Sequence, residues 1–256
     1  MIDPVAFRFG PFSVRWYALI ISMGMVLGII LTLRESKKKG IREDFFLDFF
    51  LLGIPLAIIG ARAYYVLFRW SYFSQNPARI IAIWEGGLAI HGGIIAGSLV
   101  LLFLVYRRGV DFWQAVDILA PALILGQAIG RWGNFINQEA FGGKVSQEFI
   151  SRFPEFIKQQ MYIGGAYRQP TFLYMSVWNF LVFALLLWIR RKEFIKTGDV
   201  FLTYLITYSL GRFFVEGLRT DSLYLGPFRI AQLLSVVLII VSSFLIYKRH
   251  QKGDLS

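Results

Sequence analysis

Polar side chains that could do chemistry stand inside otherwise apolar stretches of this chain. One group falls within nine residues and comprises Arg131, Asn134, Asn137 and Glu139. A second group recurs at helical intervals and comprises Tyr208, Arg212, Glu216 and Arg219. Guanidinium groups present fixed, bidentate donors to phosphate oxygens and stay charged. These patterns therefore indicate a site for a phosphate-bearing ligand.

Three further residues join these groups as candidates. His91 is one of two histidines and precedes Gly92 and Gly93; an imidazole titrates near neutrality and could act as a general base. Arg62 and Tyr17 stand in other apolar stretches. Several of these candidates also have a purely structural interpretation. His91 could be a buried side chain with its hydrogen bonds satisfied, and Arg62 could extend to the membrane interface. The Arg–Glu pair could simply lower the free-energy cost of inserting the helix into the membrane.

The composition indicates that these residues lie in a membrane protein. The chain has 256 residues, of which 56% are apolar and 17% charged, whereas soluble domains carry about 25% charged residues. It has no Cys, which excludes a disulfide-stapled module, zinc-thiolate sites and a Cys nucleophile. The net charge of +11 is interpreted as topogenic charge rather than as a nucleic-acid surface. We expect no nucleic-acid partner.

Seven stretches are long enough to cross about 30 Å of hydrocarbon as helices. They run from Trp16 to Leu33, Phe45 to Phe68, Gly86 to Tyr106, Ile118 to Ile136, Pro170 to Ile189, Val200 to Leu218 and Ile230 to Tyr247. Continuous apolar runs favour helices over a barrel. The sequence therefore predicts an all-α integral membrane protein with seven transmembrane helices, as a single domain over residues 1–256.

Basic residues predict the orientation. Fourteen of the 27 fall in connections on one side, namely Arg34, Lys37, Lys38, Lys39, Arg42, Arg107, Arg108, Arg190, Arg191, Lys192, Lys196, Lys248, Arg249 and Lys252. The positive-inside rule makes that side cytoplasmic, so the N-terminus is expected outside and the C-terminus inside. The segment 138–169 then becomes a small external head, whose apolar spacing around Phe149 to Met161 suits an amphipathic element on the bilayer surface.

With this orientation, the candidate residues converge in the outer half of the membrane. A phosphate group there belongs to a phospholipid. A transporter or flippase is the alternative, but it would need polar residues across the whole thickness, and a seven-helix receptor would use the same residues only to bind. No HExxH, GxSxG or Walker motif indicates another chemistry, and neither a metal nor a cofactor is expected.

The run from Gly130 to Gly142 resembles one family, the prolipoprotein diacylglyceryl transferases of bacterial envelopes. It fits the family signature G-R-x-G-N-F-x-N-x-E-x-x-G throughout. Supporting matches are Trp16-Tyr17, Arg62 with Tyr65 to Phe68, His91-Gly92-Gly93, and Arg212 to Glu216 with Arg219. One departure is visible at Gln169 to Met175, where the family often reads H-P-S-Q-L-Y-E.

The resemblance implies a bacterial cytoplasmic-membrane enzyme with a reaction in the outer leaflet. The sn-1,2-diacylglyceryl group of phosphatidylglycerol would pass to the lipobox cysteine of a preprolipoprotein signal peptide, releasing glycerol 1-phosphate. The expected catalytic residues are His91, Arg131 and Arg212. The expected substrate-binding residues are Tyr17, Arg62, Asn134, Asn137, Glu139, Tyr208, Glu216 and Arg219. Of these, Arg62 and Arg219 are expected either to extend to the membrane interface or to steer the anionic headgroup.

Overall fold

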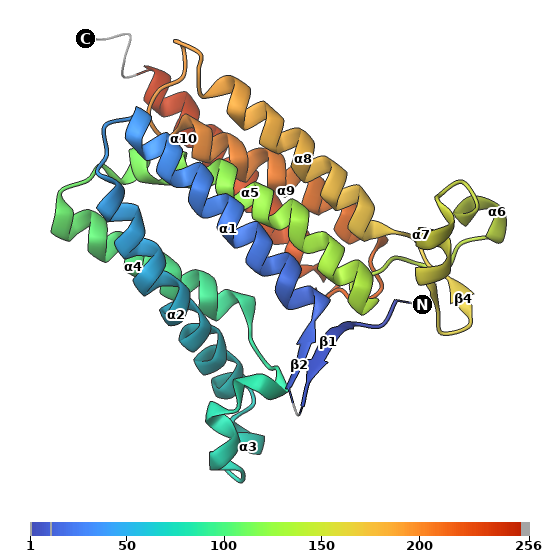
Figure 1. The fold of residues 1–256 in the computed structure, drawn as a ribbon. Helices are drawn as coiled ribbons and strands as arrows, with labels where there is room; N and C mark the ends of the chain where they lie inside the picture. The colour runs from blue at the N-terminus through green and yellow to red at the C-terminus, as the bar shows by residue number, and fades with distance from the viewer. Residues whose placement is uncertain (1, 11, 252–256) are drawn as a thin grey trace. The chain divides into compact units, whose positions relative to one another are not determined.

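The computed structural model describes residues 2–10 and 12–251, and it is mostly helical (Figure 1). Two compact units make up the chain. The first unit comprises residues up to Leu31 together with Val116 onward, and the second unit runs from Thr32 to Ala115.

Each of the seven predicted stretches coincides with a long helix. The helices are α1 (Trp16–Lys38), α2 (Glu43–Phe68), α4 (Ile90–Arg108), α5 (Phe112–Asn137), α8 (Thr171–Ile189), α9 (Asp199–Leu218) and α10 (Ile230–Gln251). Within the described residues, six of them are long and apolar enough to cross a membrane. The helix outside this set is α9, which carries Arg212 and Glu216.

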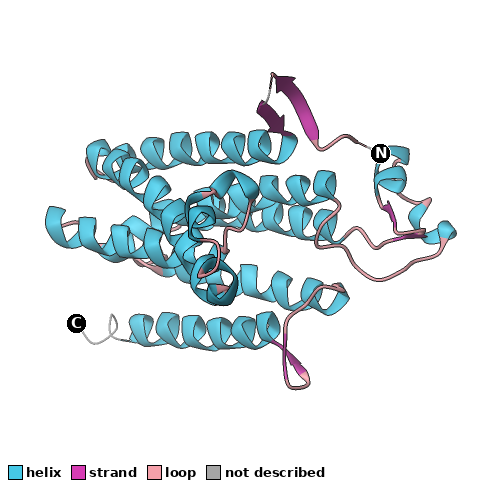
Figure 2. Ribbon diagram, turned by 90° about the horizontal axis from the view of Figure 1, so that it is seen from below, coloured by secondary structure: helices cyan, strands magenta, loops and turns pink. Residues whose placement is uncertain are grey.

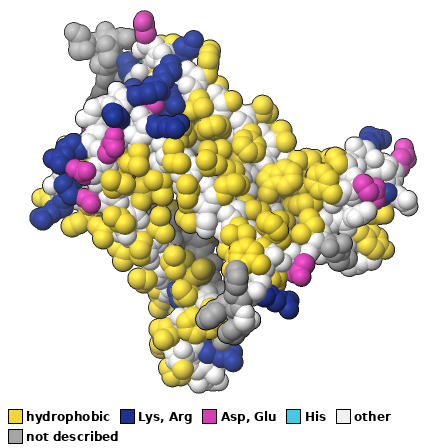
Figure 3. Space-filling model, viewed as in Figure 1, with side chains coloured by type: hydrophobic (Ala, Val, Ile, Leu, Met, Phe, Trp, Pro, Cys, Tyr) yellow, Lys and Arg dark blue, Asp and Glu magenta, His cyan; other side chains and the backbone are white. Residues whose placement is uncertain are grey.

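Large apolar side chains remain exposed along these helices, which is the opposite of a soluble fold. On α10, Leu234, Val237 and Ile240 point outward with 50% to 62% of their surface exposed. Figure 3 shows hydrophobic side chains covering the helices on one face, with Lys and Arg gathered near helix ends. Exposed apolar area of this extent is stable against lipid rather than water. The protein is therefore an all-α integral membrane protein.

The core of the first unit lies among α5, α8 and α9. Ala120 and Ile124 of α5 are fully buried, and they pack with Leu186 of α8 and with Val200 and Tyr204 of α9. Hydrogen bonds link the same helices, because the indole of Trp178 donates to the Thr207 carbonyl (2.8 Å) and that of Trp132 to the Ser176 hydroxyl (3.2 Å). Figure 2, coloured by secondary structure, shows that long helices dominate the fold. This packing sets the register between α5 and α9.

Small residues permit the closest helix crossings. A Cβ added at Gly211 of α9 would lie 2.2 Å from the Trp178 ring of α8. In the second unit, a Cβ at Gly92 of α4 would lie 2.2 Å from the Gly60 carbonyl oxygen of α2. Backbones approach this closely in membranes where small residues line the contact. The pair of α2 and α4 therefore owes its close fit to two glycines.

Short elements connect the long helices. In the second unit, α3 (Trp70–Phe73) and two 3₁₀ turns, η1 (Pro77–Ile81) and η2 (Ile83–Glu85), lead from α2 to α4. In the first unit, three antiparallel hairpins are formed by β1 (Val5–Phe9) with β2 (Phe12–Arg15), β3 (Tyr162–Ile163) with β4 (Ala166–Tyr167), and β5 (Tyr224–Leu225) with β6 (Phe228–Arg229). The body is thus all-α, and the strands described are confined to the N-terminal arm and the connections between helices.

Residues 138–169 form the predicted head segment from α6 (Gln147–Ile150), α7 (Glu155–Gln160) and the β3–β4 hairpin. Half of the six apolar residues predicted to form its amphipathic face are buried. Ile150, Ile157 and Met161 are buried at 0% to 3% exposure against Phe135 and Phe172 from the ends of α5 and α8. Half of the amphipathic face expected to meet the bilayer is therefore occupied by protein, whereas Phe156 remains 51% exposed, and this corrects the expectation in part.

The basic residues predicted to be cytoplasmic gather at helix ends within each unit. In the first unit, Arg249 of α10 bonds the Thr197 carbonyl, and the Lys196 ammonium donates to the His250 carbonyl (3.3 Å). In the second unit, Arg108 at the end of α4 pairs with Asp48 near the start of α2. Lys252 lies outside the described residues.

Candidate functional site

The signature run forms the last turns of α5 and its exit. Because α5 continues to Asn137, Arg131 and Asn134 stand one turn apart on the same side of the helix, as the spacing predicts. The exit then bends sharply, since Gln138 and Ala140 both adopt left-handed backbone (φ 54° and 55°), a conformation that costs a residue other than Gly about 1–2 kcal/mol. The strained pair marks a locally constrained turn around Glu139.

Tyr17 of α1 lies directly over the run. A Cβ at Gly133 would lie 2.5 Å from the Tyr17 ring, so only glycine allows this approach. The Tyr17 hydroxyl is near enough to Glu139 and Arg131 to interact with both charges. The Gly of the signature thus brings an aromatic hydroxyl beside the charged residues.

Arginines from two helices meet in the first unit. The Arg131 guanidinium of α5 hydrogen-bonds the Tyr208 hydroxyl of α9, and it interacts electrostatically with Arg212 and Arg219. Tyr208 also stacks on Tyr204, with ring centroids 5.9 Å apart. We name Arg131, Arg212 and Arg219 the arginine cluster.

Two carboxylates pair with Arg212 and Arg219 of the arginine cluster. Glu216, whose side chain is 3% exposed, places Oε2 2.8 Å from Nη2 of Arg212 and 3.9 Å from Nη1 of Arg219. Asp221 accepts two hydrogen bonds from Arg219 (2.9 and 2.7 Å), and these bonds lower the pKa of Asp221. Arg131 is paired with neither carboxylate, so the three cations and two carboxylates leave a net positive charge, which suits an anionic ligand.

Contacts with α8 and with the residue after α9 fix the segment that follows α5 beside this cluster. Gly142 and Arg219 form an isolated antiparallel β-bridge through their backbones. The Thr171 hydroxyl at the start of α8 donates to the Ala140 carbonyl (2.5 Å). A Cβ at Gly142 would lie 2.8 Å from Cβ of Gln169. The last glycine of the signature therefore allows α8, α9 and the exit of α5 to meet.

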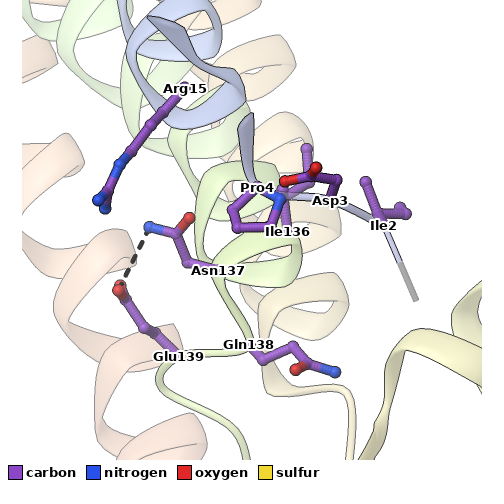
Figure 4. Close-up of a pocket in the computed structure, with 8 residues that line it drawn as sticks. All are labelled: Ile2, Asp3, Pro4, Arg15, Ile136, Asn137, Gln138 and Glu139. Carbon is purple, nitrogen blue, oxygen red and sulfur yellow. Dashed lines mark hydrogen bonds between the residues drawn. The ribbon is translucent and has the colours of Figure 1, made fainter. Parts of the chain in front are cut away.

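An open pocket of about 500 Å³ lies at the end of α5. It is lined by Ile2, Asp3, Pro4, Arg15, Ile136, Asn137, Gln138 and Glu139. Figure 4 shows Arg15 extending toward Asn137 and Glu139, which are joined by a 3.2 Å hydrogen bond, while Gln138 points away. Gln138 donates instead to the carbonyl of the buried Gln160 (2.7 Å). Asn137 and Glu139 are thus open to a ligand.

His91 and Arg62 belong to the second unit. His91 is exposed in the first turn of α4, with its ring centroid 6.0 Å from that of Tyr64. Arg62 is 7% exposed in α2, and its guanidinium bonds backbone carbonyls. All other predicted site residues lie in the first unit.

Sequence reasoning did not single out three residues that build the site. Asp221 pairs with Arg219, Arg229 bonds the Glu216 carbonyl, and Arg15 lines the pocket. The spacing Arg219-x-Asp221 could have suggested the first pair. Tyr174, at the start of α8 where the sequence departs from the family pattern, hydrogen-bonds Gln169. Among the described residues, no group of three or more His, Cys, Asp or Glu could hold a metal ion.

Fold and site together define a multi-pass, all-α membrane protein that collects three arginines and an amide-rich turn at one end of its helices. Comparison with known proteins identifies the family within this class. Residues 4–248 match the prolipoprotein diacylglyceryl transferase family, and the chain belongs to that family.

Three relatives named phosphatidylglycerol--prolipoprotein diacylglyceryl transferase illustrate the similarity. The protein of Bacillus velezensis is 52% identical over 255 residues, covering 98% of this chain and 94% of the relative. That of Streptococcus agalactiae is 51% identical over 257 residues, covering 100% and 99%. That of Bacillus cereus is 52% identical over 255 residues, covering 99% and 94%.

Proposed function

We propose that the chain transfers the sn-1,2-diacylglyceryl group of phosphatidylglycerol to the lipobox cysteine of a preprolipoprotein. The thiol sulfur bonds to the glyceryl carbon, the carbon–oxygen bond to the phosphate breaks, and glycerol 1-phosphate leaves. The names of the relatives support the two substrates. The observation that carries the proposal is the arginine cluster beside the signature turn, because it suits the phosphate that departs.

In this mechanism, Arg131 and Arg212 bind the phosphate from two helices. Negative charge on the phosphate grows as the carbon–oxygen bond breaks, so donors aimed at it bind the transition state more strongly than the ground state. Glu216 orients Arg212 through their 2.8 Å pair. Arg219, held by Asp221, steers the anionic headgroup toward Arg131 and Arg212.

The polar residues around the cluster bind the rest of the substrates. Asn134 and Asn137 hold phosphate or glycerol oxygens, and Glu139 and Tyr17 line the same end of α5. Tyr208 supports Arg131 through its hydroxyl. These assignments are supported by the shared position of the residues at the end of α5 and the facing turn of α9.

His91 is proposed as the base that accepts the thiol proton. A free thiol has a pKa of about 8.5, so a base increases the thiolate fraction near neutrality. The acceptor sulfur belongs to the substrate, which agrees with an enzyme that has no Cys of its own.

We further propose seven membrane spans in a bacterial cytoplasmic membrane, as one domain with the head 138–169 outside and the active site toward the outer leaflet. The basic helix ends support a cytoplasmic C-terminus. A reporter fused after Gly109 should read inside, and one inserted near Gln159 should read outside. The reverse pattern would contradict this topology.

The function is tested by incubating the purified protein with phosphatidylglycerol and a lipobox peptide. The peptide should gain the mass of one diacylglyceryl unit, and a peptide with Ser in place of the lipobox Cys should gain none. Phosphatidylethanolamine vesicles serve as the lipid control. Binding of phosphatidylglycerol without any mass gain would contradict the transfer reaction and favour a binding or transport role.

A further inference from the structure

The Arg62 guanidinium is almost fully engaged in hydrogen bonds within the protein. It is 7% exposed, and all three guanidinium nitrogens donate to backbone carbonyls. The acceptors are Ile80 for Nε (2.9 Å), Arg79 for Nη2 (2.6 Å), and Gly86 (2.6 Å) and Gly87 (3.1 Å) for Nη1. Four of the five donors of the guanidinium are therefore engaged within the second unit.

Aromatic rings and a glycine complete the surroundings of Arg62. Its guanidinium carbon lies 5.2 Å from the Phe73 ring centroid and 5.8 Å from that of Tyr65. Gly87 has a left-handed backbone (φ 73°), and a Cβ there would lie 2.7 Å from Nη1 of Arg62 and 2.5 Å from the Tyr65 ring. The site is thus shaped around this one side chain and leaves no room for a phosphate beside Nη1.

The carbonyls bound by Arg62 all belong to the linking segment, which we define as residues 76–89. This segment is built from short 3₁₀ turns, η1 and η2, and it exposes large apolar side chains: Ile81 is 74% exposed and Trp84 is 78% exposed. Irregular backbone next to lipid needs polar partners from the protein itself. Arg62 supplies those partners from α2, on the inner side of the segment.

The linking segment leads directly into the first turn of α4. The Ala89 amide donates to the Ala61 carbonyl (3.0 Å), next to Arg62 in α2. Gly92 then packs on Gly60 at the closest point of the two helices. His91 stands between these two contacts, so its backbone position follows from how the segment is held against α2.

We propose that Arg62 is a positioning residue: it holds the backbone of the linking segment and thereby fixes the first turn of α4 that presents His91. The consequence for activity rests on the proposed function, whereas the hold on the segment does not. Arg62 then acts on turnover rather than on lipid affinity, which differs from the headgroup-steering role predicted from sequence. A point charge cannot replace it, because the carbonyls are bound from three separate nitrogens.

The test uses the natural absence of Cys in the chain. A single reporter, Ala82→Cys, replaces a residue of the linking segment that is 4% exposed, and its reaction rate with a permeant maleimide measures opening of the segment. Arg62→Gln and Arg62→Lys are each combined with it. Arg69→Gln is the matched control, because Arg69 lies over the same Tyr65 ring (4.9 Å) but is exposed. Val100→Cys, 8% exposed in α4, reports whether the unit stays folded.

Arg62→Gln should raise the labelling rate at Ala82→Cys about 10- to 100-fold, the range for losing a charge-assisted hydrogen bond. The rate at Val100→Cys should not change. The kcat for transfer should fall by a similar factor, with KM for phosphatidylglycerol within about twofold. Arg62→Lys should behave like Arg62→Gln, and Arg69→Gln like the parent.

Several outcomes would overturn the proposal. A raised KM with unchanged labelling would make Arg62 a lipid ligand. Full restoration by Arg62→Lys would mean that charge alone suffices, and faster labelling with an unchanged kcat would sever the link to His91. If the parent protein transfers no diacylglyceryl group, the proposed function fails, yet the labelling rates still decide whether Arg62 holds the segment.

Discussion

Replacing Arg212 by Lys tests the phosphate clamp most directly. Arg212 comes from α9, and its Nη2 lies 2.8 Å from Oε2 of Glu216. Lys keeps the charge but loses the planar fork that binds two phosphate oxygens at once. The buried Glu216 still has Arg219 at 3.9 Å, so the carboxylate is not left without a cation and the variant should fold.

The size of the effect follows from the role of Arg212 at the departing phosphate. Removing one donor aimed at developing charge costs about 10²- to 10³-fold in rate, or about 2.7–4 kcal/mol. Arg131→Lys should cost a similar factor, since Arg131 reaches the cluster from α5. Arg212→Gln should lower the transfer rate more than Arg212→Lys does, because it removes the charge as well as the planar fork.

The assay is single-turnover transfer to a lipobox peptide, with phosphatidylglycerol binding measured separately in the same detergent. Arg168→Lys is the control, because Arg168 lies over the Phe141 ring in the head segment (5.3 Å) and is outside the proposed clamp. Its rate should match that of the unmodified protein. Unmodified rates for both Arg131→Lys and Arg212→Gln would refute the clamp.

Three further predictions concern the base, the helix crossing and the pH range. His91→Asn should lower the single-turnover rate about 10²- to 10⁴-fold with little change in lipid binding, and a higher pH should restore part of it; full activity at neutral pH would exclude His91 as the base. Gly211→Ala should reduce the free energy of unfolding by about 1–3 kcal/mol and so lower the unfolding temperature, because its Cβ would lie 2.2 Å from an indole ring. Gly97→Ala, whose Cβ would have nothing within 4 Å, should leave the unfolding temperature unchanged. The pKa of Asp221 is lowered by the hydrogen bonds from Arg219, so its contribution to stability is complete above the unfolded pKa of about 3.9 and is lost as the pH falls through the folded value. Thermal unfolding of the unmodified protein and of Asp221→Asn should therefore converge at the lowest pH, and a constant difference there would contradict this reasoning.

Local pattern alone was enough to predict the seven long helices of this protein. Long apolar runs leave the backbone no stable alternative to helix in a membrane, and all seven predicted stretches are helices. The spacing of Tyr208, Arg212, Glu216 and Arg219 predicted a shared face of one helix. The first three lie in α9, whereas Arg219 follows the last residue of that helix with an extended backbone (ψ 149°). The signature from Gly130 to Gly142 indicated the family, and the family match confirms it.

What lies across each helix was decided only by tertiary packing. The pairing of Arg131 with Tyr208 depends on the register between α5 and α9, and that register is set by buried residues far apart in the chain. The sequence could not show that Arg62 turns inward, because the carbonyls it binds lie 17 to 25 residues away in the chain. Polar groups in an apolar surrounding bind whichever partners the fold brings near, and which partners come near is a property of the whole chain rather than of any one segment.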